Sequence, residues 1–300
     1  MKDQAHTLRK LFEKGTAHPQ PKVLSVTSGK GGVGKTTLVI NMAIMLASKG
    51  HRVLVFDADL GLANVDVMLG LTPKRTIKHV LDGQCPLEDI MVKGPEGIQV
   101  IPASSGIQEL VDLSPQQQLS LMNSLDYFNH DIDYMIIDTG AGISRNVMYF
   151  NAAAQRVIVV VSAEPTSITD AYALIKVLWK KHGVKQFDLI VNNVISKMEG
   201  DQVAGKLMMV CERFLGDVAL EMLGSVPHDE TITECIKGQK AFVGVNPNGE
   251  TALRLGRIVK RLEKSSRLQT NGNLQFFLRR MLLHQMKGSD HAGYRIHGTY

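Results

Sequence analysis

A glycine-rich segment with two lysines, Gly29-Lys30-Gly31-Gly32-Val33-Gly34-Lys35-Thr36-Thr37, follows directly on an apolar run at residues 23–28. It satisfies the pattern G-x-x-x-x-G-K-[ST], which binds phosphate when a strand precedes it and a helix follows. The apolar periodic segment 38–47 supplies such a helix. Glycines in this loop let successive N–H groups turn inward around phosphate oxygens. The segment therefore predicts nucleoside triphosphate binding, with Lys35 at the terminal phosphates and the Thr36 hydroxyl on Mg²⁺.

Short runs rich in Val and Ile recur along the chain with helical patterns between them, which is typical of parallel strands covered on both faces. We expect a doubly wound, mostly parallel α/β sheet with helices on both faces. Ser114-Pro115 predicts the start of one crossover helix. No linker rich in Pro, Gly or Ser interrupts residues 23–264, so we expect one domain there. The expected strands are 23–28, 53–57, 98–102, 133–138, 156–162, 187–192 and 220–226.

Three aspartates end two of the expected strands. Asp57 and Asp59 are two residues apart and so project from the same face, and Asp138 closes the run Tyr134-Met-Ile-Ile-Asp138. Ligands of α/β sheets bind at the carboxyl ends of the strands. These carboxylates are therefore candidates for the metal and the attacking water, although Asp-x-Asp before a glycine is also a common turn or cap.

Three further residues are candidates for contact with the base. Asn192 ends a strand with an amide that can pair with both donor and acceptor edges of adenine. Pro227 and Asp229 lie in Val226-Pro227-His228-Asp229. All three also have an ordinary interpretation as loop residues. The sequence contains no Asn/Thr-Lys-x-Asp guanine motif, which favours ATP over GTP.

The second lysine of the loop, Lys30, gives a family resemblance, because a common phosphate loop does not require it. The string Lys30-Gly-Gly-Val-Gly-Lys35-Thr-Thr resembles the deviant Walker A group of P-loop ATPases, the MinD/ParA family. This resemblance implies a MinD-like fold, ATP and Mg²⁺ as cofactors, and a homodimer that forms with ATP.

The same resemblance implies a role for each site residue. Lys30 would reach the phosphates of the other subunit, where it acts with Lys35 and Asp59 in catalysis. Asp59 would position the attacking water, and Asp57 would lie in the water shell of Mg²⁺. Asp138 resembles Walker B and, with Thr36, would orient the metal. The nucleotide contacts would be Gly29, Lys30, Gly31, Gly32, Val33, Gly34, Lys35, Thr36, Thr37, Asn192, Pro227 and Asp229.

Net charge is distributed unevenly along the chain. The total of +5 arises from 34 Lys and Arg against 29 Asp and Glu. Residues 1–22 carry five basic and two acidic side chains, and residues 265–300 carry five and one. The remaining chain is nearly neutral, which argues against a nucleic-acid groove across the domain. We therefore expect no specific nucleic-acid partner.

The N-terminal segment Asp3-Gln4-Ala5-His6-Thr7-Leu8-Arg9 resembles the D-Q-A-x-x-L-R motif of the FlhG group within this family. That resemblance implies that residues 1–22 form a partner-activating extension that stimulates the GTPase FlhF. Ala5, Leu8, Leu11 and Phe12 would share one face of a short helix. An unstructured terminus is the alternative. The residues that match the motif and would contact the partner are Asp3, Gln4, Ala5, Leu8 and Arg9.

The C-terminal region divides into a polar linker at 265–272, an amphipathic segment at 273–287 and a polar tail at 288–300 that we cannot assign. The amphipathic segment has basic flanks and resembles the membrane-targeting helix of MinD and FlhG. It would lie in the interface of an anionic membrane. A final core helix docked on the sheet is the alternative. The expected membrane contacts are Leu274, Phe277, Leu278, Met281 and Leu282.

Several classes of protein are excluded or disfavoured. No apolar run approaches the roughly 18–20 residues that span a bilayer. The charged N-terminus lacks a secretory signal. Cys85, Cys211 and Cys235 form no C-x-x-C pair, which disfavours a disulfide framework and an iron–sulfur carrier. We expect a cytoplasmic protein that associates reversibly with the inner face of the membrane.

The sequence therefore predicts an FlhG-type ATPase that regulates flagellar number and placement with FlhF. Further partners that the resemblance implies are flagellar switch (C-ring) proteins and a FleQ-type regulator. The alternatives are a MinD-like division-site regulator, a ParA-like DNA-segregation ATPase and a scaffold whose ATPase site is inactive.

Overall fold

The computed structural model describes residues 21–59, 64–102 and 132–264. Its centre is one eight-stranded sheet, and seven of the strands coincide with the seven segments expected from the sequence. The eighth, β3, contains two residues and pairs antiparallel with β4 at the sheet border, too short to be recognised from its pattern. The strands are β1 (Lys22–Ser28), β2 (Val53–Ala58), β3 (Val92–Lys93), β4 (Gln99–Ile101), β5 (Tyr134–Ala141), β6 (Arg156–Val161), β7 (Gln186–Val194) and β8 (Ala219–Pro227).

The strand order is β3-β4-β2-β5-β1-β6-β7-β8, and every pair except β3–β4 is parallel. β5 lies between β1 and β2, so the chain leaves β1 toward one side of the sheet and leaves β5 toward the other. The loops after these two strands therefore diverge, which creates the crevice where α/β sheets bind ligands. We call the edge at which the parallel strands end the carboxyl edge, and the edge at which they begin the amino edge.

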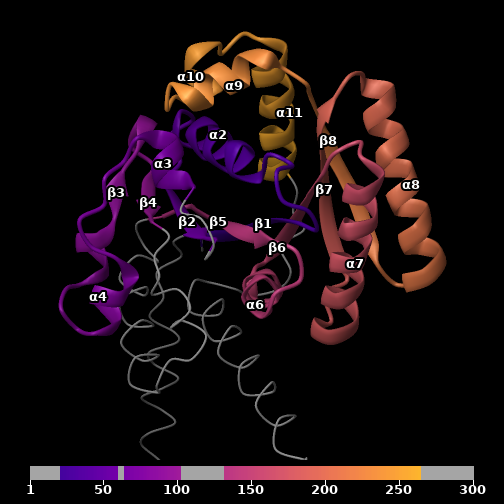
Figure 1. The fold of residues 1–300 in the computed structure, drawn as a ribbon, viewed down its shortest axis with the longest axis horizontal. Coiled ribbons are helices and arrows are strands. Elements are labelled where there is room, and N and C mark those ends of the chain that lie inside the picture. The colour runs from indigo at the N-terminus through magenta and orange to yellow at the C-terminus, as the bar shows by residue number, and fades with distance from the viewer. Residues whose placement is uncertain (1–20, 60–63, 103–131, 265–300) are drawn as a thin grey trace, which may run out of the picture.

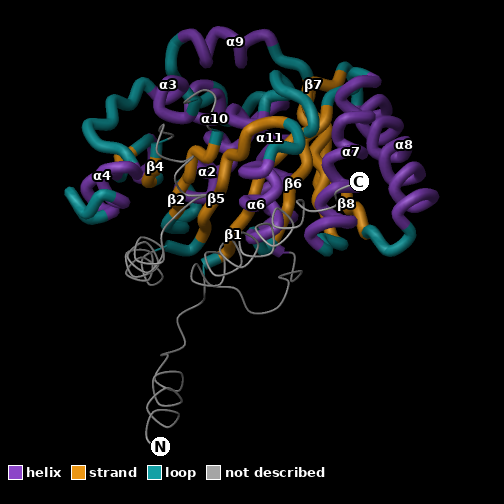
Figure 2. Tube along the Cα trace, turned by 60° about the horizontal axis from the view of Figure 1, so that its bottom comes forward, coloured by secondary structure: helices purple, strands orange, loops and turns teal. Residues whose placement is uncertain are grey.

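Helices cover both faces of the sheet, as expected. α2, α9, α10 and α11 group together in Figure 1, and residues of α2, α10 and α11 share one hydrophobic core with Val26 and Ile136. α6, α7 and α8 bury a second core with Val159 and Val191. Figure 2 shows α7 and α8 beside β7 and β8. The helices are α2 (Lys35–Ala47), α3 (Val65–Leu69), α4 (Ile77–Leu81), α6 (Arg145–Ala153), α7 (Pro165–His182), α8 (Lys197–Leu215), α9 (Glu230–Lys237), α10 (Phe242–Val245) and α11 (Glu250–Lys264).

Local sequence signals account for the ends of the long helices. α7 begins with Pro165 at its first position and ends at His182, directly before Gly183, whose φ is 70°. α8 begins after Ser196, whose side chain accepts a hydrogen bond from the Glu199 N–H. These signals explain why both helices begin near the carboxyl edge and why α7 ends near the amino edge.

Five expectations lie outside the described residues: the extension at 1–22 except for its last two residues, the helix start at Ser114-Pro115, the linker at 265–272, the amphipathic segment at 273–287 and the polar tail at 288–300. They stay predictions. Within the described ranges, no helix is both long enough and apolar enough to cross a membrane.

Candidate nucleotide-binding site

The glycine-rich loop connects β1 to α2 at the carboxyl edge. Gly32 and Gly34 have φ of 77° and 89°, a region that side chains disfavour. A Cβ on Gly34 would overlap the Asn192 amide, and a Cβ on Gly29 would overlap the backbone of α7 at Asp170. Backbone conformation therefore favours glycine at position 32, lack of space requires it at position 29, and both reasons apply at position 34.

Below the loop, Thr36 meets Asp138 of β5. The Thr36 hydroxyl donates to Asp138 Oδ2 at 2.6 Å. Asp138 is fully buried, and its Oδ1 is a buried oxygen without a hydrogen-bond partner among the described residues. Burial raises the pKa of this carboxyl to about 7, although the Thr36 hydroxyl and the charge of Lys35 oppose the rise. A buried carboxylate with an open oxygen, beside a threonine hydroxyl, fits a cation held by oxygen ligands.

Asp57 lies next to Asp138, because the two residues pair in the register of β2 and β5. Its carboxylate accepts backbone hydrogen bonds from Asp59, Asn64 and Val65 at 3.0–3.2 Å. Burial, the largest effect, raises its pKa to about 6, and the three backbone donors oppose this rise. Both oxygens are thus engaged with backbone N–H groups, which is compatible with a place in the water shell of a metal rather than direct coordination.

Asp59 follows at the end of β2, and its carboxylate lies against Gly140. A Cβ placed on Gly140 would stand 3.3 Å from Asp59 Oδ1. The described residues contain no group of three His, Cys, Asp or Glu side chains arranged to hold a metal. Mg²⁺ at nucleotide sites is bound by one or two side chains together with phosphates and water, so such a group is not required.

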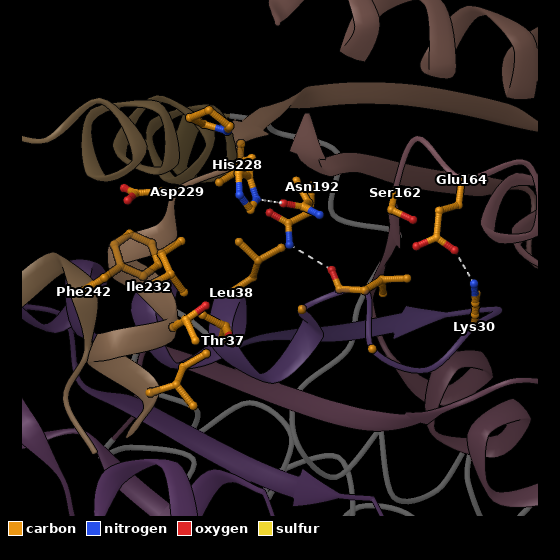
Figure 3. A pocket seen from close by; sticks show the side chains of 18 of the residues that line it. Lys30, Thr37, Leu38, Ser162, Glu164, Asn192, His228, Asp229, Ile232 and Phe242 are labelled. Carbon is orange, nitrogen blue, oxygen red and sulfur yellow. Dashed lines mark hydrogen bonds and ion pairs between the residues drawn. The ribbon is translucent and has the colours of Figure 1, made fainter. Parts of the chain in front are cut away.

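Lys30 belongs to the phosphate loop, and its side chain contacts the start of α7. Its ammonium group forms an ion pair with Glu164 (Figure 3). It also donates to the Thr166 hydroxyl at 3.1 Å. Both partners of the ion pair are well exposed, with 37 % and 62 % of their side-chain areas accessible. The structure therefore brings Lys30 to Glu164 of its own chain, a partner that the sequence did not indicate.

A cavity of about 270 Å³ opens beside the loop. The three expected base contacts line it (Figure 3), but two of them also make structural bonds. The Asn192 amide donates to the Val33 carbonyl at 2.8 Å and so ties β7 to the phosphate loop. Asp229 caps α9 by accepting from the Thr231 N–H at 3.0 Å, and hydroxyl groups of Thr231 and Thr251 lower its pKa.

Other lining residues were not expected. Asn193 and His228 line the cavity. Asn193 has φ of 60°, and its Oδ1 lies 2.6 Å from His228 Nδ1. Phe242 of α10 and Ile232 of α9 supply an apolar wall (Figure 3). Ser162 at the end of β6 contributes a buried hydroxyl without a hydrogen-bond partner among the described residues. The sequence gives no local signal for these lining residues, because their place at the cavity depends on how α9 and α10 pack beside the phosphate loop.

Comparisons with known proteins agree with this geometry. A family described as an AAA domain matches residues 21–191. The antiactivator FleN of Pseudomonas aeruginosa is 44 % identical over 281 residues, covering 93 % of this chain and 99 % of FleN. The flagellum site-determining protein YlxH of Helicobacter pylori is 32 % identical over 265 residues, covering 87 % and 90 %.

Among solved structures, a chain of the MinC:MinD cell division protein complex of Aquifex aeolicus superposes with a TM-score of 0.66 at 25 % identity, covering 84 % of this chain and 99 % of that chain. The extent of the match to FleN, with the phosphate loop and the hydrogen bond from Thr36 to the buried Asp138, places this protein in the MinD/ParA family of P-loop ATPases, in the FlhG-type group that contains FleN and YlxH.

Proposed function

We propose that this chain is a Mg²⁺-dependent ATPase that forms a homodimer with ATP, binds the membrane through residues 273–287 and regulates flagellar number and placement with the GTPase FlhF. The observation that carries the catalytic part is the Thr36–Asp138 pair beneath a complete phosphate loop. The regulatory part is supported by the names of FleN, an antiactivator, and YlxH, a flagellum site-determining protein. An antiactivator acts against an activator, which supports a FleQ-type partner. C-ring proteins remain a further proposed partner.

Each site residue has a role in this proposal. The loop N–H groups and Lys35, which is 8 % exposed, bind the phosphates. Thr36 and Asp138 would hold Mg²⁺, with Asp57 in its water shell, and the ion would supply positive charge opposite the phosphates. Asp59 orients the attacking water. Asn192, Pro227 and Asp229 line the base region.

Lys30 would have to leave Glu164 to reach the phosphates of a partner subunit. We therefore expect Glu164→Gln to raise the fraction of ATP-bound dimer by up to about fivefold, because an exposed ion pair contributes roughly 0.2–1 kcal/mol. Light scattering with Mg-ATP measures the dimer fraction. Asp170→Asn, on the same helix but outside this ion pair, is the matched control. A dimer fraction equal to that of wild type would show that the ion pair does not restrain Lys30.

The proposed interaction with FlhF is tested by measuring GTP hydrolysis by FlhF. We expect the wild-type chain to raise GTP hydrolysis by FlhF, and Gln4→Ala with Arg9→Ala to reduce this stimulation at least about tenfold, since two polar contacts of about 1 kcal/mol each are lost. ATP hydrolysis by the variant should equal that of wild type. Lys10→Ala with Lys14→Ala is the control for loss of charge in the same segment. Wild-type chain that leaves FlhF unstimulated would favour a MinD-like regulator instead.

A further inference from the structure

The amino edge of the sheet collects the ends of the described chain. β1 begins there at Lys22 and α11 ends there at Lys264, because α11 runs back from the carboxyl edge. Two ion pairs confirm that distant segments meet at this edge. One joins Lys49, just after α2, to Glu263 at the end of α11. In the other, Arg52 Nη2 lies 3.0 Å from Asp133 Oδ1. The segments 1–21 and 265–300 therefore both attach to the domain on the side opposite the phosphate loop.

Positive charge is concentrated at this edge. Its segments carry twelve Lys and Arg against seven Asp and Glu, whereas the other described residues carry thirteen against fifteen. Four lysines of the edge, Lys180, Lys181, Lys260 and Lys264, are exposed. The edge segments are residue 22 and residues 48–53, 93–99, 132–134, 154–157, 180–188, 212–221 and 260–264.

An exposed aromatic side chain accompanies these charges. Phe214 is in the last turn of α8, with 61 % of its surface exposed, and the Arg213 guanidinium lies 5.4 Å from its ring centroid. A large apolar side chain beside a cation matches the headgroup region of a bilayer, where apolar rings enter the boundary and cations meet lipid phosphates.

We propose that the amino edge is a second membrane-contact surface, which lies on anionic lipid when residues 273–287 insert. This inference rests on the proposed membrane association and adds residues of the ATPase domain to it. Only eight residues, 265–272, separate Lys264 from the amphipathic segment, a span of at most about 30 Å, so insertion holds this edge near the bilayer. Stable anchoring needs a second signal beside one reversible apolar anchor, and a basic surface supplies it.

This orientation has a consequence for the nucleotide site. The phosphate loop and Lys30 lie at the carboxyl edge, so they face away from the lipid. The nucleotide site therefore stays open to solution and to a second copy while the amino edge of the first copy lies on lipid.

The inference is tested with the full chain and Mg-ATP by co-sedimentation with vesicles. Vesicles of phosphatidylglycerol and phosphatidylcholine are compared with vesicles of phosphatidylcholine alone. The edge variant combines Lys180→Gln, Lys181→Gln, Lys260→Gln and Lys264→Gln. The matched control combines Lys197→Gln, Lys206→Gln, Lys237→Gln and Lys240→Gln, which removes four exposed charges from outside the amino edge. Leu278→Glu tests the amphipathic segment separately.

We expect the edge variant to bind anionic vesicles at least about tenfold more weakly than wild type and the control variant to stay within about threefold, because each cation near an anionic surface favours binding about fivefold. Binding to phosphatidylcholine should be the same for all three. Equal binding of the edge and control variants to anionic vesicles would overturn the inference while leaving the proposed function intact.

The other outcomes separate the two claims. If Leu278→Glu binds vesicles as wild type does and the edge variant does not, the proposed membrane role of residues 273–287 is wrong and that of the amino edge is supported. If wild type binds neither kind of vesicle, both claims fail. If the edge variant keeps lipid binding but loses retardation of DNA, the surface serves nucleic acid and the lipid assignment is overturned. Thermal unfolding of each variant checks that the substitutions leave the fold unchanged.

Discussion

Replacing Asp138 by asparagine should strongly reduce ATP turnover without lowering the stability of the ligand-free protein. Asp138 is fully buried and its Oδ1 has no partner among the described residues, so its charge opposes folding until a cation arrives. Asparagine removes the charge and keeps an oxygen for the Thr36 hydroxyl. We expect turnover to fall about 10²–10³-fold, the usual effect of removing one charge-stabilising group.

The pH dependence of stability should change in the same variant. The folded-state pKa of Asp138 is raised from 3.8 to about 7, so the native state binds more protons than the unfolded chain between these values. Wild-type ligand-free stability should therefore fall as pH rises from about 4 to about 7, and the slope should be smaller in Asp138→Asn. Some slope should remain, because the pKa of Asp57 is also raised, to about 6.

Thermal unfolding with and without Mg-ATP measures these effects beside a turnover assay. Mg-ATP should stabilise wild type by about 3 kcal/mol at a hundred times its Kd, and this gain should be lost in the variant. Asp188→Asn is the matched control, because Asp188 is a buried aspartate on β7 that already has a cationic partner. That control should lose stability and keep the gain from Mg-ATP. A ligand-free Asp138→Asn protein that is clearly less stable than wild type would contradict this account of the site.

The catalytic half of the site could be predicted from the sequence because it is built from elements that follow one another directly in the chain. A strand, a glycine loop and a helix are consecutive in the chain, so the loop pattern fixes both the structure and the place of Lys35. Asp57 and Asp138 lie toward the carboxyl ends of β2 and β5, and the carboxyl ends of parallel strands meet at one edge whatever the strand order. Their adjacency in the β2–β5 register follows from this rule.

The base region was harder to predict, because each polar side chain there has several possible partners. Asn192 binds the phosphate loop through Val33, and Asp229 caps α9. The ion pair between Lys30 and Glu164 joins residues 134 positions apart, and no periodic pattern announces it. These contacts are decided by the packing of β6, β7 and β8 against the loop, which the sequence does not encode locally.

Strand order itself accounts for the largest feature that the sequence analysis missed, a buried ion pair between neighbouring strands. Arg156 begins β6 and donates two hydrogen bonds of 2.8 Å to the Asp188 carboxylate on β7. It also donates at 3.4 Å to the Leu262 carbonyl of α11. The side chains are only 5 % and 8 % exposed. One guanidinium thus ties together the sheet and the last described helix.

Arg156→Met should therefore destabilise the protein by about 3–5 kcal/mol, because it leaves a buried carboxylate without its cation. For a domain of this size the melting temperature should fall by roughly 10 °C. Asp188→Leu in addition to Arg156→Met should restore much of the loss, since an apolar pair replaces an ionic one of similar volume at little cost. Urea unfolding of wild type, the single variant and the double variant measures the three free energies.

Hydrogen exchange adds a readout that separates this contact from a general loss of packing. Amides in the last turns of α11 should lose protection in Arg156→Met beyond the loss in α8, because only α11 is bonded to the guanidinium through the Leu262 carbonyl. Leu215→Ala, a buried residue at the end of α8, is the control for lost packing at the same edge. In the urea experiment, a double variant less stable than the single variant would show that the charge pair contributes more free energy than its desolvation costs. In the exchange experiment, equal protection of α8 and α11 would show that Arg156 does not hold α11, the helix that precedes the proposed membrane segment.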